Sequence, residues 1–187
     1  MARGRSDGED WNVLVIGKQG FTGRALNALD RLGRFRTAGY PQVLIGMVDR
    51  PEGDASGLDA ILPAARGEGD YGELLERIVP VEKAVVFARD DVTEVMCVAL
   101  EPLAARLCGK SFHVRAHLRG LKGRLEHPAV ERALGAFLVE QARRAGPSPT
   151  VRFADADVIV AVEVVGRRVG YAFLTREMRG APLVRAR

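Results

Sequence analysis

SFHVRAHLRGLKGR, residues 111–124, alternates apolar and polar side chains with a period of two. The apolar positions are Phe112, Val114, Ala116 and Leu118, and the positions between and after them are His113, Arg115, His117 and Arg119. Successive side chains of a strand point to opposite faces, so the pattern predicts a strand with one core face and one cationic face. Lys122 and Arg124 continue the positive charge into the next loop. The stretch as a whole is suited to a phosphate backbone.

The positive charge is local. The chain has a formal net charge of only +4, with 28 Lys and Arg against 24 Asp and Glu. Between Pro102 and Glu126, the closing glutamate is the only acid. This concentration predicts a binding partner, although an ordinary solvated face is an open alternative. The candidate nucleic-acid-contacting residues are Lys110, His113, Arg115, His117, Arg119, Lys122 and Arg124.

The bulk composition is that of a globular protein. Of 187 residues, 47% are hydrophobic and 28% are charged, a size that fits one domain or two small ones. No run reaches the roughly 18 apolar residues that a membrane span needs. The charged start MARGRSDGED lacks an apolar signal core, so residues 1–10 are expected to be a disordered tail and the protein cytoplasmic.

No metal site or cofactor is expected. His113 and His117 are four residues apart, which would place them on one face of a helix. On a strand the same spacing separates them by about 13 Å, too far for one ion. Asp155 and Asp157 could do acid–base work or hold Mg²⁺, but two acids at the start of a strand more often cap a turn.

The first half of the chain predicts a ferredoxin-like domain over residues 11–88. Its expected order is strand, helix, two strands, helical segments and strand. The corresponding segments are Asn12–Ile16, a helix over residues 25–32, two strands within Phe35–Val48, helical turns over Leu58–Ala65 and Tyr71–Ile78, and a strand over Val81–Ala88.

The second half, residues 89–179, predicts another α/β unit. A helix begins at Asp91 and bends at Pro102, the basic strand follows, and a second helix runs from Pro128 to Gly146. An apolar hairpin turning at Gly166 closes the unit. Residues 180–187 are expected to form a mobile, weakly basic tail.

A glycine-rich loop supports an alternative function. Gly17, Gly20 and Gly23 stand between a strand and a helix, where a pyrophosphate approaches the helix N-terminus in dinucleotide-binding proteins. The spacing is GxxGxxG rather than GxGxxG, and no acid ends a second parallel strand about 20 residues further on. A small nucleotide-binding protein or enzyme that uses Lys18 is therefore the second hypothesis. A protein-interaction scaffold with an acidic partner is the third.

The C-terminal half resembles a THUMP domain, an RNA-binding module of tRNA-modifying enzymes. The resemblance rests on Phe112–Arg115 with Arg119, on Gly135 within ALGAFL, and on Asp155-Ala156-Asp157 before VIVAVEVVG, and it spans Asp91 to Arg179. The family's usual Asn-Pro-Asp is replaced here by residues 154–157, ADAD. The first half fits the ferredoxin-like domain that precedes THUMP, and residues 77–83 resemble the junction.

The resemblance implies an α+β protein that binds the acceptor stem and 3′ end of tRNA. In most such proteins a catalytic domain is attached, whereas this layout is similar to the stand-alone THUMP adaptors of tRNA cytidine acetylation. We therefore expect a non-catalytic adaptor that presents tRNA to a separate RNA-modifying enzyme.

Overall fold

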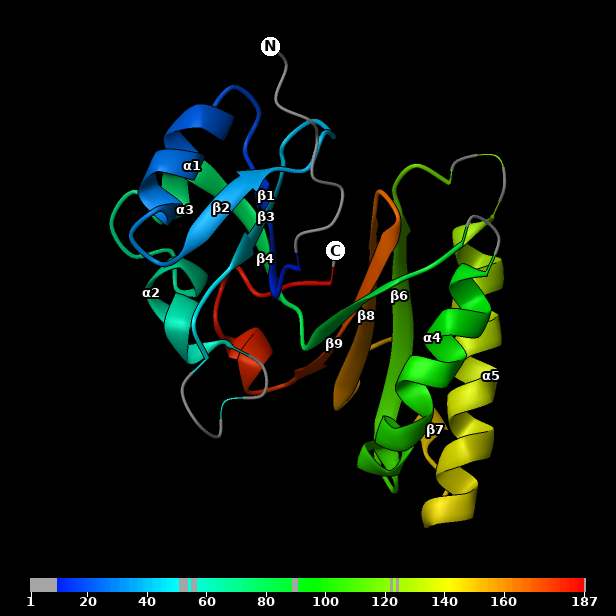
Figure 1. The fold of residues 1–187 in the computed structure, drawn as a ribbon. Coiled ribbons are helices and arrows are strands. Elements are labelled where there is room, and N and C mark those ends of the chain that lie inside the picture. The colour runs from blue at the N-terminus through cyan, green and yellow to red at the C-terminus, as the bar shows by residue number, and fades with distance from the viewer. Residues whose placement is uncertain are drawn as a thin grey trace.

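The computed structural model contains two sheets, each with its own helices (Figure 1). It describes residues 10–50, 54, 57–88, 91–121, 123 and 125–186. The predicted N-terminal tail lies, except for Asp10, outside the described residues. The same holds for Lys122, Arg124 and Arg187.

The first sheet has four antiparallel strands in the order β2-β3-β1-β4. The strands are β1 (Val13–Gly17), β2 (Arg34–Thr37), β3 (Val43–Met47) and β4 (Leu75–Pro80). Its helical elements are α1 (Thr22–Leu29), η1 (Asp59–Ile61), α2 (Leu62–Ala65) and α3 (Tyr71–Leu74). This order is that of a ferredoxin-like unit, in which the neighbouring strands of the sheet are antiparallel.

Two sequence-based assignments in this half were wrong. The helix expected over Tyr71–Ile78 ends at Leu74, and the chain continues directly into β4. Leu75, Ile78 and Val79 are all buried, and a short apolar run of this kind does not distinguish strand from helix. The strand within Val81–Ala88 is β5 (Lys83–Val86), which pairs with β9 of the second sheet rather than with the first sheet.

The second sheet is mixed and has the order β5-β9-β8-β6-β7. Its further strands are β6 (Ser111–Leu118), β7 (Thr150–Val151), β8 (Val158–Val165) and β9 (Arg168–Thr175). β6 is parallel to β7 and β8, whereas β9 is antiparallel to β8 and β5. The predicted basic strand and the C-terminal hairpin are thus confirmed.

Helices cover one face of this sheet, and the first unit covers the other (Figure 1). The helical face carries α4 (Val92–Leu100), the 3-10 segment η2 (Glu101–Leu107) and α5 (His127–Ala145). The expected bend at Pro102 takes the form of this change from α- to 3-10 helix. Asp91 directly precedes α4 but makes no side-chain capping hydrogen bond. Phe112, Val114, Ala116 and Leu118 pack toward the helices, as the alternation predicted.

The opposite face of the second sheet packs against the first unit through apolar side chains. Ala161 and Val165 of β8, with Ala172 and Leu174 of β9, belong to the same buried core as the first sheet. Trp11 lies against Gly170, where an added Cβ would come within 2.7 Å of the indole ring.

The segment after β9 is not a mobile tail. It forms the 3-10 turn η3 (Met178–Gly180) and returns to the first unit, where Val184 bridges to Ile78 of β4 in parallel. The backbone N–H of Ile78 donates to Leu183 at 2.7 Å. Leu183, Val184 and Ala186 are buried, so these few apolar side chains dock the otherwise basic segment.

Candidate nucleic-acid interface

The predicted basic stripe of β6 divides into separate environments. His113 and Arg115 lie beside a groove at the sheet edge, His117 and Arg119 lie in the contact between the two units, and Lys110 is exposed at the start of the strand. Lys122 and Arg124 lie outside the described residues. Consequently, the described members of the stripe do not form one continuous cationic face.

The groove follows the edge of β6, because β7 pairs only with Ser111 and Phe112. Further along this edge, side chains of α5 take the place of a neighbouring strand. Oε1 of Glu131 accepts the backbone N–H of Ala116 at 2.9 Å, and Nε2 of His127 accepts that of Leu118 at 3.2 Å. Side chains that satisfy an open sheet edge in this way prevent another strand from pairing with it.

The groove has a volume of about 740 Å³ and lies between β6, α5 and the segment that follows β7. Three arginines line it: Arg115, Arg132 and Arg143. Its mouth carries two exposed apolar side chains, Val151 and Phe153, of which Phe153 is 67% exposed. Pockets of this size accept a small organic ring system.

Phe153 contacts one aromatic ring and one guanidinium group. The centroid of the Phe153 ring lies 5.6 Å from that of the His113 ring. The guanidinium carbon of Arg115 lies 5.8 Å from the Phe153 centroid. Arg115 also lies 3.6 Å from Glu131, so its position is fixed from two sides. An exposed aromatic ring beside arginines is the arrangement on which proteins stack unpaired bases while they neutralise the phosphates.

His113 lies in the wall of the groove. Its Nδ1 lies 2.9 Å from the carbonyl oxygen of Arg152, and because that oxygen only accepts, Nδ1 must carry the proton. Burial lowers the pKa of His113, an effect that this hydrogen bond only partly offsets. The lowered pKa disfavours a positive charge on this ring, which contacts Phe153 and the Arg152 carbonyl.

His117 and Arg119 face a buried carboxylate. Nη1 of Arg119 donates to Oε2 of Glu163 at 2.5 Å, and Glu163 has no exposed side-chain surface. Nε2 of His117 lies 2.9 Å from Nη1 of Arg77 and 2.8 Å from the carbonyl oxygen of Ala186. Burial lowers the pKa of His117, with Glu163 acting in the opposite direction.

The two acids before β8 have a structural role in the turn. Oδ2 of Asp157 accepts from both the backbone N–H and the hydroxyl of Ser111, at 2.8 and 2.6 Å. These hydrogen bonds lower the pKa of Asp157. Arg176 pairs with both carboxylates, at 3.3 Å from Asp155 and 3.2 Å from Asp157.

The glycine-rich loop uses its polar groups within the protein. The backbone N–H groups of Gly17 and Lys18 donate to Gln42 and Leu74, and Nζ of Lys18 donates to the carbonyl oxygen of Gly72 at 2.7 Å. These three donors therefore bind other parts of the protein, at the place where the nucleotide-binding hypothesis would have them bind phosphates.

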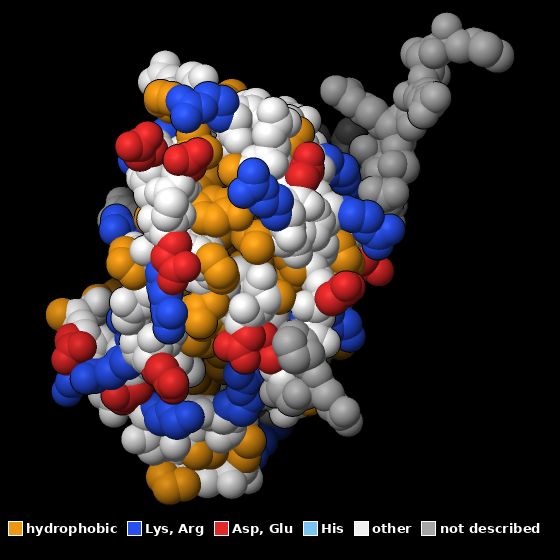
Figure 2. Space-filling view, turned by 90° about the vertical axis from the view of Figure 1, so that its left-hand side faces the viewer, with side chains coloured by type: hydrophobic (Ala, Val, Ile, Leu, Met, Phe, Trp, Pro, Cys, Tyr) orange, Lys and Arg blue, Asp and Glu red, His pale blue; other side chains and the backbone are white. Residues whose placement is uncertain are grey.

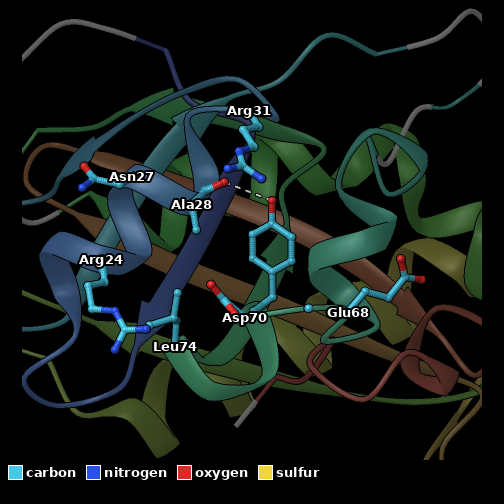
Figure 3. Close-up of a pocket in the computed structure, with 9 residues that line it drawn as sticks. Arg24, Asn27, Ala28, Arg31, Glu68, Asp70 and Leu74 are labelled. Atoms are coloured by element: carbon cyan, nitrogen blue, oxygen red, sulfur yellow. Dashed lines mark hydrogen bonds between the residues drawn. The ribbon is translucent and has the colours of Figure 1, made fainter.

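A polar pocket of about 490 Å³ lies beyond this loop, between α1 and α3 (Figure 3). Arg24 and Arg31 stand on one side, Glu68 and Asp70 on the other, and the Tyr71 hydroxyl donates to the carbonyl of Ala28 at 3.0 Å. On the side of the molecule that carries these helices, apolar side chains gather in the middle and charged side chains of both signs surround them (Figure 2). Such mixed charge favours no single anionic or cationic ligand.

Sequence reasoning missed the groove residues outside β6. Phe153 had one available signal, since it is an aromatic residue directly after Arg152 in a polar loop. Arg132 and Arg143 had none, because charged positions on an amphipathic helix usually indicate only a solvated face.

Among the described residues, no group of three or more His, Cys, Asp or Glu side chains could hold a metal ion. Within the same part of the chain, no helix has both the length and the apolar character needed to cross a membrane.

No protein-family model matches the chain, and no curated protein matches it in sequence. Solved structures match it in fold. TrmN from Thermus thermophilus superposes with a TM-score of 0.58 at 21% identity, covering 88% of this chain and 45% of its own. PH1313 from Pyrococcus horikoshii OT3 gives 0.57 at 13% identity, covering 88% and 54%. A 4-thiouridine synthetase, crystallised with RNA and ATP, gives 0.55 at 15% identity, covering 88% and 41%.

These matches establish the fold. The chain spans between two fifths and just over half of the length of each of these structures. The α+β class that the THUMP resemblance implied, with an antiparallel ferredoxin-like sheet followed by a mixed sheet, is confirmed.

Proposed function

We propose that this protein binds tRNA through the groove at the edge of β6 and acts as a non-catalytic adaptor for a separate RNA-modifying enzyme. The observation that carries the proposal is Phe153, 67% exposed beside Arg115 at the mouth of a groove lined by further arginines. Val151 is also exposed at this groove, and apolar side chains that gather at a groove indicate a ligand-binding site, whereas a single exposed one does not.

The geometry favours single-stranded RNA at this point. Proteins read RNA mostly at unpaired nucleotides, because the deep groove of an A-form duplex hides the base edges from side chains. An unpaired base would stack on Phe153 or enter the groove, while Arg132 and Arg143 would meet the flanking phosphates. The 3′ end of tRNA is such a segment, and Lys110, which is exposed at the start of β6, would contact the adjoining stem.

The structural matches support RNA as the ligand. A protein that shares this fold, the 4-thiouridine synthetase, was crystallised with RNA. The candidate acids Asp155 and Asp157 are bound to Arg176 and Ser111, which supports placing the chemistry in a partner enzyme. Cytidine acetylation is the specific candidate that the resemblance to stand-alone THUMP adaptors suggests.

Fluorescence anisotropy with a labelled tRNA tests the binding site. We expect Phe153→Leu to weaken binding of intact tRNA about tenfold, since stacking on an aromatic ring contributes about 1–3 kcal/mol per base. A tRNA without its 3′ end should bind wild type and variant equally weakly.

Phe21→Leu is the matched control. Phe21 is also exposed and also lies against an arginine, with Arg24 at 5.5 Å, but it is on the first unit. Equal effects of the two substitutions, or equal binding of intact and truncated tRNA, would place the RNA elsewhere.

Reconstitution tests the adaptor role. The purified protein incubated with tRNA and acetyl-coenzyme A should leave the tRNA unchanged, whereas adding an RNA cytidine acetyltransferase should yield N4-acetylcytidine. Omitting the protein, or using the Phe153→Leu variant, should reduce the yield. Modification by the protein alone would show that it is an enzyme.

A further inference from the structure

Glu163 lies at the centre of a charge cluster that joins both units. Oε2 is 2.5 Å from Nη1 of Arg119, and Oε1 is 3.2 Å from Nη1 of Arg77. Arg77 belongs to β4 of the first unit, whereas Glu163 and Arg119 belong to the second. The same nitrogen of Arg77 also donates to the carbonyl oxygen of Ala186 at 2.7 Å.

The cluster is dry. Glu163 has no exposed surface and the Arg77 side chain is 6% exposed. Oε1 of Glu163 makes no hydrogen bond within the described part of the protein, although it forms the ion pair with Arg77. Charges removed from water in this way return little net stabilisation, because the cost of desolvation offsets their attraction.

The contact around the cluster is apolar. Ala161, Val165, Ala172 and Leu174 share one core with the first sheet, and Trp11 packs on Gly170. Apolar contact is not directional and tolerates sliding, whereas an ion pair with fixed hydrogen-bond geometry does not. In some proteins a buried ionic group selects one arrangement of packed elements while adding little to stability.

A second groove depends on that arrangement. Its volume is about 700 Å³, and it combines Tyr40 of the first unit with His117, Arg119 and the following loop of the second. The Tyr40 hydroxyl approaches Gly120 so closely that an added Cβ would lie 2.5 Å from it. Any rotation between the units changes this groove.

We propose that Glu163 is a positioning residue that, through Arg77 and Arg119, selects one orientation of the two units and so shapes the groove between Tyr40 and Arg119. The orientation follows from the cluster itself, whereas an effect on RNA rests on the proposed function. In this view Arg119 acts through Glu163 and not by direct contact with phosphate.

The test measures orientation without RNA. Spin labels on two exposed positions, Asn27 of α1 and Ala133 of α5, report the distance between the units by pulsed electron paramagnetic resonance. The wild type should give one narrow distance distribution. The variant Arg77→Met, Arg119→Met, Glu163→Leu replaces the cluster by apolar groups and should remain folded while the distribution broadens or shifts.

Arg119→Gln provides a milder variant, since Arg77 still faces Glu163 in it, and it should give a smaller broadening. Glu140→Gln is the control, because the ion pair of Glu140 with Arg144 lies on the exposed surface of α5. A distribution identical to wild type in the triple variant, or in Arg119→Gln if the triple variant does not fold, overturns the proposal.

RNA binding then separates the two proposals. If the wild type binds tRNA, the triple variant should bind it about tenfold more weakly. The groove at the edge of β6 and the groove between Tyr40 and Arg119 would no longer be held in one geometry, so RNA bound at one of them would meet the other at a lower effective concentration. Equal tRNA affinity with a broadened distribution would remove the groove's role in RNA binding but keep the positioning role. A wild type that binds no tRNA would overturn only the proposed function.

Discussion

Nη1 of Arg119 lies 2.5 Å from Oε2 of Glu163, a carboxylate with no exposed surface. Arg119 was expected on an open cationic face, yet it compensates a buried negative charge at the contact between the two units. The alternation that predicted the strand was sound, but the face it assigned to solvent is partly covered by the first sheet.

Removing the charge of Glu163 should therefore destabilise the protein. We expect Glu163→Gln to lower the free energy of unfolding by about 3 kcal/mol, because Arg77 and Arg119 would remain buried without their counter-charge. Urea denaturation measures this, with Glu140→Gln as a surface control that should cost less than about 0.5 kcal/mol. A loss below about 1 kcal/mol for Glu163→Gln would mean that water reaches the two guanidinium groups.

The packing of Trp11 on Gly170 gives a second stability prediction. In Gly170→Ala the new Cβ would lie 2.7 Å from the Trp11 ring and 2.8 Å from Cγ1 of Val81. We expect a loss of about 1–3 kcal/mol from overpacking. Gly180→Ala is the control, since no atom lies within 4 Å of its Cβ position. Equal melting temperatures of the two variants would show that the contact between the units rearranges to accept the added methyl group.

The sequence could predict those parts of the fold that depend on local patterns. β6, the long helix α5 and the closing hairpin follow from alternation, from Pro128 at the helix start and from Gly166 at the turn. Pairing between distant segments has no local signal. For that reason β5 was placed in the wrong sheet, and the docking of Leu183 and Val184 beside β4 was not foreseen.

The candidate site was predictable only in part for a similar reason. Arg115 and His113 were found because they belong to a regular strand. Phe153 lies about 40 residues further on, and only the pairing of β7 beside β6 brings it to them. The alternation of side chains within one strand does not predict which later strand will lie parallel beside it.

Stability should fall as the pH drops below about 6.5. Burial lowers the pKa values of His113 and His117 below the 6.5 of an unfolded histidine, so the unfolded state binds protons first. Their contribution is complete above pH 6.5 and is lost as the pH falls through the folded-state pKa values. Chemical denaturation from pH 8 to pH 5 measures it, and His113→Gln should flatten the profile. A wild-type profile that is flat down to pH 5 would contradict the prediction.

Arg132 and Arg143 should contribute to RNA affinity through counterion release. Each phosphate contact adds roughly 0.7–0.9 to the slope of log affinity against log salt. Arg132→Gln with Arg143→Gln should therefore reduce that slope by about 1–2 and weaken binding at low salt. Arg144→Gln is the control, because Arg144 is the next residue along α5 but is not among the residues that line the groove. An unchanged slope in the double variant would exclude these arginines from the interface.

Substitutions of Gly135 should change the stability of the protein and its affinity for tRNA in opposite directions. It lies in α5 on the wall of the groove, its φ is not positive, and an added Cβ would have no atom within 4 Å. Glutamine favours a helix over glycine, so Gly135→Gln should raise the free energy of unfolding by about 0.5 kcal/mol. The same side chain would extend into the groove and should weaken tRNA binding. Gly135→Ala should raise the free energy of unfolding by about 1 kcal/mol with little effect on binding, because one methyl group leaves room for a base. General damage to the fold cannot explain a Gly135→Gln variant that is more stable than wild type but binds tRNA more weakly. Wild-type affinity in this variant would show that no nucleotide enters the groove.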